Sequence, residues 1–472
     1  MTEPVAEALS TAGGSDPAAG RPASSFGTGY RVWLLILTVA VGAFGFIDRV
    51  IFSTLAEAIK KDLSLTDFQL GLLGGLSFAI FYSTMGLPIA RLAERRSRIN
   101  IISISVALFS AATVMCGMAA SFSHLFLLRI GVGIGEAGVQ APTVSLLADH
   151  FPPERRGAVT TIMKLGSPLG SIVGAMSAGL IGSIYGWRTA VMLIAVPGLL
   201  VALLFKLTLR EPARGTADPG ALPIDGPLPS ARAVFKTMAA RPEFRHMLIA
   251  LGLVTIELYG AGAFYSPFFM RAHGLTLAQV GVYYAIQSGV AATVGFAIGG
   301  FGVDFIARKG AQWYALIPAI GVGLSVPFNL VGYSVSDPIV ASGFLICGAI
   351  VIFFHNVPTL VALQNMVDSR MRATAAFVFF FVTTLVGVGL GPVLLGFVSD
   401  LYAGAVFTMG DYATLCAGGK ASHASAALRD ACTTASTSGI RYALLSATVF
   451  AAWSMVHYLL AARALRRSNA AV

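Results

Sequence analysis

Charged side chains stand inside apolar stretches of this chain, where they are costly. Arg129 and Glu136 belong to the run Arg129-Ile-Gly-Val-Gly-Ile-Gly-Glu136, within an apolar segment from Leu125 to Leu147 that is long enough to cross a bilayer. A charge at bilayer depth costs about 2.5–3.5 kcal/mol on insertion scales. Two helical turns separate Arg129 from Glu136, so both project from one face. We expect that face to meet the protein interior or a water-filled cavity and to carry the chemistry.

A second acid and base, Asp48-Arg49, interrupt an apolar run near the start of the chain. Neighbouring helical residues project about 100° apart, so these two cannot pair tightly with each other. Arg129 is the expected partner of Asp48, and Glu136 that of Arg49. An arginine stabilises an ionised carboxylate, and an apolar cavity favours the neutral acid. Exchange of partners would therefore let Asp48 and Glu136 carry protons, while Arg49 and Arg129 pair the acids or receive an anion; the alternative is a static network that fixes helix register.

The second half of the chain offers aromatic rings and few charges. An aromatic wall with a few polar anchors suits an acyl chain attached to a polar head. Each ring could instead serve helix packing, and the histidine could titrate or be structural. The candidates for substrate binding or charge pairing are Glu257, Tyr259, Tyr265, Gln287, His355 and Asn356.

The composition is that of a polytopic membrane protein. Of 472 residues, 56% are hydrophobic and 11% are charged, whereas soluble chains carry about 25% charged residues. The sequence shows neither a catalytic serine arrangement nor a metal-ligand cluster, so we expect no enzyme activity, catalytic residue, metal or cofactor. Hydropathy predicts an all-α protein with twelve transmembrane helices, at about 31–56, 68–90, 99–120, 124–147, 157–184, 187–209, 244–271, 277–302, 311–333, 339–365, 370–402 and 439–465.

The net charge of +10 reports topology and not a nucleic-acid partner. With the N-terminus inside, most of the Lys and Arg residues fall on the cytoplasmic side, as the positive-inside rule requires. Arg49, Arg129 and Lys164 fall within spans. We expect a monomer in the cell inner membrane with both termini cytoplasmic. The basic residues expected outside are Lys60, Lys61, Arg188, Arg271, Lys420, Arg429 and Arg441.

A proline-rich connection divides the twelve spans six and six. We predict a disordered cytoplasmic N-terminus over residues 1–29, and a cytoplasmic linker over 210–243 with a possible interfacial helix. A six-helix bundle is expected on each side of that linker, over 30–209 and 244–465. Residues 466–472 would form a cytoplasmic tail.

The two bundles carry matching residues, which indicates duplication of one six-helix unit. Such parallel repeats, related by an axis along the membrane normal, bind substrate near the midplane between the halves. Each match alone carries little weight, but all occupy equivalent topological positions. The matches are Pro142-Thr143 with Pro358-Thr359 and Arg156 with Arg372, both at an offset of 216, and Glu94 with Asp304 and Asp48 with Glu257 at similar offsets.

The segment Ala90-Arg-Leu-Ala-Glu94-Arg-Arg-Ser97-Arg98 resembles the loop 2–3 signature of the major facilitator superfamily, a Gly-x-Leu-x-Asp-Arg-x-Gly-Arg pattern. Here Ala90, Glu94 and Ser97 replace the first Gly, the Asp and the second Gly. Pro153-Glu-Arg-Arg156-Gly-Ala resembles that family's loop 4–5 motif. The resemblance implies a gating role, and the alternative is charge that only sets topology. The gating candidates are Arg91, Glu94, Arg95, Arg98, Arg156, Asp304 and Arg372.

Asp48-Arg49, together with Arg129-x-Gly-x-Gly-x-Gly-Glu136-Ala-Gly, resembles the spinster branch of that superfamily. The resemblance spans about residues 30–465 and implies transport of lysophospholipids or sphingosine-phosphate-type lipids. The Gly-x-Gly-x-x-Gly pattern at Gly133 is not a dinucleotide loop, because it lies in a membrane helix without a preceding strand. We interpret its glycines as a packing surface.

Cys416 and Cys432 lie together in the expected outside loop before the last helix, where an oxidising compartment permits a disulfide. Three functions are compatible with the sequence. The first is a proton-coupled, alternating-access transporter of a lipid-like anion, with protons and membrane lipids as partners. The second is a proton-coupled carrier of a small organic anion or drug. The third, a receptor or scaffold without flux, is disfavoured by the short inside segments.

Overall fold

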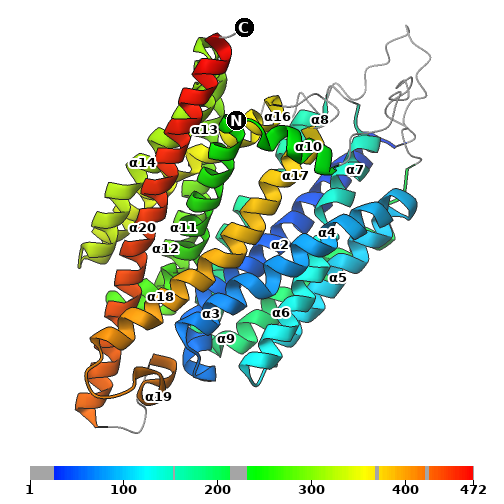
Figure 1. Ribbon diagram of the computed structural model, residues 1–472. Helices are drawn as coiled ribbons and strands as arrows, with labels where there is room; N and C mark the ends of the chain where they lie inside the picture. The colour runs from blue at the N-terminus through cyan, green and yellow to red at the C-terminus, as the bar shows by residue number, and fades with distance from the viewer. Residues whose placement is uncertain (1–25, 153–154, 213–230, 367–371, 420–424, 471–472) are drawn as a thin grey trace, which may run out of the picture.

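The computed structural model of the protein describes residues 26–152, 155–212, 231–366, 372–419 and 425–470, and within these ranges the regular structure is helical (Figure 1). The first half of the chain contains one group of helices, which lie on the right of Figure 1. Their bounds are α2 (Thr28–Leu63), α3 (Asp67–Gly71), η2 (Leu72–Leu76), α4 (Ser77–Arg95), α5 (Arg98–Cys116), α6 (Phe122–Ala137), α7 (Gln140–His150), α8 (Arg156–Lys164) and α9 (Gly166–Thr208).

The second group, which we call the C-half as opposed to the N-half, lies on the left of Figure 1 and is reached through α10 (Ala231–Ala239). It contains α11 (Pro242–Ala272), α12 (Leu277–Ala285), η4 (Ile286–Ala291), α13 (Ala292–Ile306), η5 (Ala307–Lys309), α14 (Trp313–Ser334), α15 (Pro338–Ile352), η6 (Phe353–His355), α16 (Asn356–Asn365), α17 (Arg372–Val382), η8 (Thr383–Leu390), α18 (Gly391–Val406), α19 (Tyr412–Leu415), η9 (Ala417–Gly419) and α20 (Ala426–Ala470).

Eleven helical segments of the described chain are long and apolar enough to cross a membrane. One of them, Ala158–Thr208, has 51 residues, far more than a single crossing needs. Gly186 breaks it with φ 80° and ψ 163°, a conformation that glycine adopts without a Cβ penalty. The break divides the segment into two crossings, so the predicted count of twelve is confirmed.

Several helices are longer than hydropathy predicted, because their ends continue beyond the apolar window, and the last and the first are examples. The last helix was expected to begin at 439, but α20 begins at Ala426. Its first turns pack around Cys432, in a small apolar cluster with Phe407 and Cys416. The first helix was expected to end at 56, but α2 runs to Leu63 because its last turns are buried. The C-terminal tail is likewise helical as far as Ala470.

A local repeat shapes the start of the second helix in each half. Leu65-Thr-Asp-Phe-Gln-Leu-Gly71 recurs as Leu275-Thr-Leu-Ala-Gln-Val-Gly281. In both, the threonine and glutamine form a capping box that satisfies free backbone amides at the helix start. Both segments follow a residue with positive φ, which is Ser64 at 53° and Gly274 at 66°. The structure therefore supports the duplication by local geometry as well as by matched residues.

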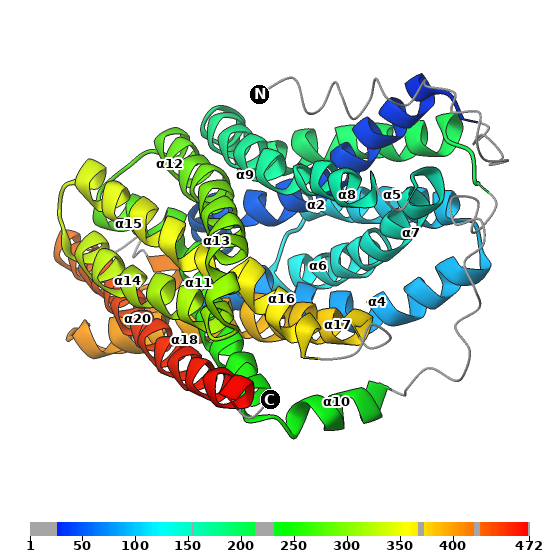
Figure 2. The same ribbon diagram turned by 90° about the horizontal axis from the view of Figure 1, so that it is seen from above.

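Glycines bring the halves together at their interface, where α3 packs on α18 (Figure 1) and α9 packs on α12 (Figure 2). A Cβ on Gly71 would lie 2.2 Å from the Pro392 carbonyl oxygen, and one on Gly179 would lie 2.8 Å from the Cα of Gly281. These backbones approach each other as closely as small residues permit. We call the end of the molecule where α2 begins the linker face, and the end where α2 stops the opposite face.

The connection between the halves is described only in part, since residues 213–230 lie outside the described ranges, as do residues 1–25 of the expected N-terminal tail. Helix α10 lies next to the start of α11 (Figure 2). Its Met238 is buried against the C-half core, whereas Phe235 is exposed. An interfacial role for α10 stays a prediction.

Candidate functional site

The site in the N-half begins with Asp48 on α2 and Arg129 on α6, which form an ion pair of 2.6 Å between Oδ2 and Nη1. Both are buried, with 3% and 1% of their surface exposed. The Thr113 hydroxyl of α5 donates to the other oxygen of Asp48, and the Arg129 guanidinium lies 4.2 Å from the Phe52 ring centroid. Every oxygen of this carboxylate thus has a partner, as a buried charge requires.

Arg49, the residue after Asp48 on α2, pairs with Glu136 on α6. Its Nη2 and Nε both donate to Oε2 of Glu136, at 2.7 and 3.1 Å. The Arg49 side chain is 26% exposed while that of Glu136 is 4% exposed. Oε1 of Glu136 is buried and has no hydrogen-bond partner among the described residues. Both expected pairings between α2 and α6 are therefore present, and the second one is the more exposed of the two.

Two adjoining cavities meet at Arg49. The larger one, of about 1190 Å³, lies between the halves and is lined mostly by apolar and aromatic side chains. The smaller one, of about 700 Å³, lies inside the N-half and contains Glu136. Three residues line both, and they are Phe46, Arg49 and Ser167. We call these the central cavity and the N-half pocket.

The C-half candidates divide into two groups. Tyr259 on α11 and Gln287 on η4 line the central cavity, as expected of substrate-binding residues. Tyr265 is buried instead in a stack with Tyr284. His355 is fully buried, with its Nδ1 2.6 Å from the Ile352 carbonyl oxygen, which favours the structural interpretation.

Neither Asn356 nor Glu257 is among the residues that line either cavity. Glu257 faces away from the cavity toward α14, where the Asn329 amide donates to its Oε1 at 2.8 Å. Its Oε2 is buried without a partner in the part of the chain that the structure describes. The sequence pattern could not separate the residues of α11 that face the cavity from those that face α14, because the helix is apolar all round.

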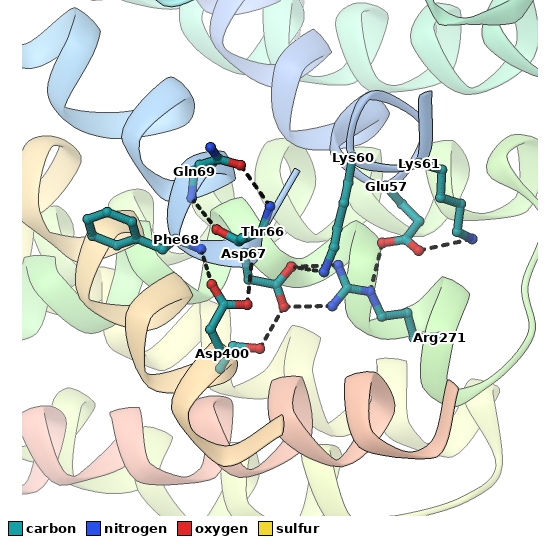
Figure 3. Close-up of polar contacts among 10 residues, drawn as sticks. Glu57, Lys60, Lys61, Thr66, Asp67, Phe68, Gln69, Arg271 and Asp400 are labelled. Atoms are coloured by element: carbon teal, nitrogen blue, oxygen red, sulfur yellow. Dashed lines mark hydrogen bonds and ion pairs between the residues drawn. The ribbon is translucent and has the colours of Figure 1, made fainter. Parts of the chain in front are cut away.

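Sequence reasoning missed a charged cluster that joins the halves at the opposite face (Figure 3). Arg271, from the end of α11, donates to Asp67 at 2.7 and 2.8 Å and to Glu57 at 2.7 Å. Lys60 also pairs with Asp67, at 2.7 Å, and Lys61 with Glu57, at 2.9 Å. We call these five residues the outer cluster.

The outer cluster is tied further to α18. The Ser399 hydroxyl donates to Asp67 at 2.7 Å. The Asp400 carboxylate accepts the backbone amides of Asp67 and Phe68, at 3.0 and 2.7 Å, which lie at the start of α3 (Figure 3). A carboxylate is stabilised there by the free amides of a helix start. In the sequence, these charged residues stand at the ends of loops, where charges are common. The one sequence signal for the cluster is Asp67, because the corresponding residue in the second copy of the repeat is Leu277.

The expected gating residues lie at the linker face, but they differ in burial and in the contacts they make. Arg98 is buried, and it pairs with Asp149 and, at 2.7 Å, with Glu211 of the linker. Arg156 donates to the Ala148 carbonyl oxygen at 2.8 Å, which ties α8 to α7. The other N-half candidates, Arg91, Glu94 and Arg95, form the exposed end of α4. Asp304 and Arg372 belong to α13 and α17, but their side chains lie outside what the structure describes.

Burial and hydrogen bonding act in opposite directions on Glu211. Burial raises its pKa, but hydrogen bonds from the Ile99 amide and the Arg98 guanidinium lower it by more, and the resulting pKa lies below the usual range. The ionised carboxylate thus fastens the start of the linker to α5. On the opposite face, Cys416 and Cys432 form a disulfide between the segment before α20 and α20 itself. Within the described residues, no group of three or more His, Cys, Asp or Glu could hold a metal ion.

Residues 34–409 match the family described as Major Facilitator Superfamily. A solved structure of a bacterial homologue of the human lysosomal transporter Spinster, in an inward-facing and unoccupied conformation, is 30% identical, with a TM-score of 0.84. That match covers 96% of this chain and 99% of the other. An MFS-type efflux pump of Mycolicibacterium smegmatis is 29% identical over 78% of this chain and 85% of its own length. A hexuronate transporter of Bacillus subtilis is 24% identical, over 78% and 87%.

Proposed function

This chain belongs to the Major Facilitator Superfamily, and we propose that it carries an amphipathic, lipid-like anion across the membrane by alternating access, coupled to protons. The protein is a multi-pass membrane transporter, so its substrate must contact both halves in turn. The chemistry of the two cavities bears on the kind of substrate.

The observation that carries the proposal is the place of the Arg49–Glu136 pair, at the junction of a small charged pocket and a large apolar cavity. A lysophospholipid or sphingosine-phosphate-like molecule has both parts. Its anionic head would pair with Arg49, and its chain would lie along Phe296, Phe353 and Tyr259 of the C-half. The similarity to a bacterial Spinster homologue supports the same substrate class.

Protons would couple through Glu136. Ionised, Glu136 holds Arg49 and compensates its charge; protonated, it releases Arg49 to an anion entering the cavity. Its free Oε1 leaves room for that proton. Asp48 is fully paired with Arg129 and Thr113, so it would take part only after α2 and α6 rearrange.

The outer cluster would act as the gate of the opposite face. It joins α2 and α3 of the N-half to α11 through buried ion pairs and to α18 through hydrogen bonds, and so supports a state closed at that face. The positive-inside distribution supports a cytoplasmic linker face and cytoplasmic termini. The described state would then be inward-facing, in the inner membrane of a bacterium, and the chain would act as a monomer. The linker-face arginines of α4 would form the second gate.

The test is transport of a radiolabelled lysophospholipid by the purified full-length chain in liposomes, with and without a pH gradient. Glu136→Gln should abolish the response to the gradient while Glu257→Gln keeps it, because only Glu136 contacts Arg49. Equal responses of both variants would overturn the coupling role.

A second candidate is a small organic anion or drug, which the efflux-pump and hexuronate-transporter relatives favour. Competition separates the two. Excess hexuronate, benzoate or a cationic drug should leave lysophospholipid flux unchanged if the substrate is lipid-like. Uptake of one of them by the purified protein, with no lysophospholipid flux, would establish the second candidate.

A further inference from the structure

Lys164, the last residue of α8, lines the N-half pocket, as Arg49 does. It lies within a segment apolar enough to span the membrane, where an ammonium group needs a reason to be present. Its side chain is exposed, and it makes no hydrogen bond or ion pair within the described residues. Its contacts therefore reveal no structural role for this lysine.

Lys164 leaves the N-half pocket with a net positive charge. The charged residues that line it are Arg49, Glu136 and Lys164. Arg49 and Glu136 neutralise each other at 2.7 Å, so the charge of Lys164 is left over. The remaining polar lining consists of neutral donors and acceptors, which are Thr38, Tyr82, Gln140, Thr143 and Ser167. An anion entering this pocket would meet one free cation, and a second once Glu136 releases Arg49.

The backbone beside Lys164 is held in place against α2. A Cβ on Gly166 would lie 2.5 Å from the Val39 carbonyl oxygen, and one on Gly170 would lie 2.3 Å from that of Ala43. Gly42, on the same stretch of α2, lines the pocket together with Lys164. The attachment point of the lysine is therefore fixed at the pocket wall, while its flexible stem lets the ammonium follow a ligand.

We propose that Lys164 is a second cation of the substrate site and selects heads that carry two negative charges, such as a phosphate monoester, over singly charged or zwitterionic heads. The inference rests on the proposed function and names the head that the lipid-like anion carries. A phosphate monoester bears about −1.5 to −2 charges near neutral pH and three acceptor oxygens. It would therefore engage Arg49 bidentately and Lys164 as a point charge.

The competing explanation for a lysine at this position is that it extends its side chain to the membrane surface (snorkelling). Its stem would then cross apolar surface and place the ammonium among headgroups at the linker face. A snorkelling lysine would help to set topology, but it would not distinguish one substrate head from another. Head selectivity is therefore the property to measure.

The experiment measures binding of three lysolipids with the same acyl chain to the purified full-length protein at pH 8. The probes are lysophosphatidic acid, a monoester dianion, lysophosphatidylglycerol, a monoanion, and lysophosphatidylcholine, a zwitterion. The variants are Lys164→Gln and Lys164→Arg, with Lys206→Gln as the control. Lys206 is a lysine of α9 that hydrogen-bonds Asn100 and lines neither cavity.

Wild type should prefer the dianion. Lys164→Gln should weaken dianion binding about tenfold, the effect of losing one charge-assisted contact. The other two lipids should change less than threefold, and Lys164→Arg and Lys206→Gln should retain the preference. Equal weakening of all three lipids, or no change in Lys164→Gln, would overturn the role of Lys164 while leaving the proposed function in place. A wild type that binds none of the three would overturn both.

Discussion

Asp48 and Glu257 occupy equivalent places near the middle of α2 and α11, yet their surroundings differ. Each accepts a hydrogen bond from the equivalent neighbouring helix, from Thr113 in the N-half and from Asn329 in the C-half, two residues related by the offset of 216. At that same offset Arg129 corresponds to Leu345, so the N-half carboxylate has a buried cation beside it, whereas the C-half carboxyl group has none among the described residues.

The same contrast recurs where the halves meet. Thr66 and Thr276 cap equivalent helices in the same way, but the next residue is Asp67 in one copy and Leu277 in the other. Asp67 binds across the interface to Arg271, whereas Leu277 packs in the core. Duplication thus accounts for the helices and their caps, and the departures from it place charged residues where the second copy has apolar ones.

The largest expected effect concerns the two carboxyl groups. Asp48→Asn leaves Arg129 buried without a counter-charge and should lower the free energy of unfolding by about 3–5 kcal/mol. Glu257→Gln keeps the oxygen that accepts from Asn329 and should cost less than about 1 kcal/mol. Denaturant unfolding of both variants in mixed micelles measures the difference. Similar losses in the two variants would mean that both carboxyl groups depend equally on charge compensation.

A second prediction compares the two cations that hold Glu57. Arg271→Met removes a buried ion pair between the halves and should destabilise closure of the opposite face by about 3 kcal/mol, the low end for such pairs, because Lys60 still holds Asp67. Lys61→Ala removes a half-exposed pair within α2 and should change the equilibrium by about 0.5 kcal/mol.

Spin labels at Ala120 and Ser336, exposed residues of opposite halves that lie at the opposite face, report the separation of the halves there. Arg271→Met should populate a longer distance that is rare in wild type and in Lys61→Ala. An unchanged distance distribution in Arg271→Met would show that this face stays closed through the close backbone contacts between the halves, such as Gly71 against Pro392.

A smaller effect on stability is expected at the turn before the repeated segment, where the first copy has Ser64 and the second has Gly274. Ser64 adopts φ 53°, a left-handed conformation that disfavours residues with a Cβ, so Ser64→Gly should add about 1 kcal/mol of stability. Gly274 has φ 66° and open space around a Cβ position, so Gly274→Ala should lose a similar amount through backbone strain alone. Opposite shifts of the unfolding midpoint in the two variants would confirm the equivalence of the turns; shifts of the same sign would contradict it.

The smallest effect concerns Glu211, which belongs to an ion-pair cluster of the N-half linker face. Its folded pKa lies below the usual value of about 4.3, so its contribution is present above that pH and is lost as pH falls through the lowered folded value. Glu211→Gln should cost about 0.5 kcal/mol at pH 7, with transport unchanged. Unfolding midpoints at pH 7 and near pH 3 should show the gap to wild type closing, and a constant gap would exclude the ion pair as its cause.

Much of the site followed from the cost of charge in apolar sequence. The pairs Asp48–Arg129 and Arg49–Glu136 were predictable because four charges on two membrane helices must find partners. The outer cluster was not, since Lys60 and Arg271 stand at helix ends, where exposed charges are ordinary. Tyr265 and His355 were expected near substrate but are buried in packing, because a helix that is apolar all round does not reveal which face it turns to a cavity.

The sequence by itself determined the twelve membrane helices, their duplication and the charged face of α6, because hydropathy, repeat spacing and helical period are local properties. The tertiary structure decided which charges meet across the halves and which side chains line the cavities. Those choices depend on backbone approaches such as Gly71 against Pro392 and on the packing that places Lys164 at the N-half pocket. Contacts between segments that are distant in the chain are set by packing, and no window of the sequence contains both partners.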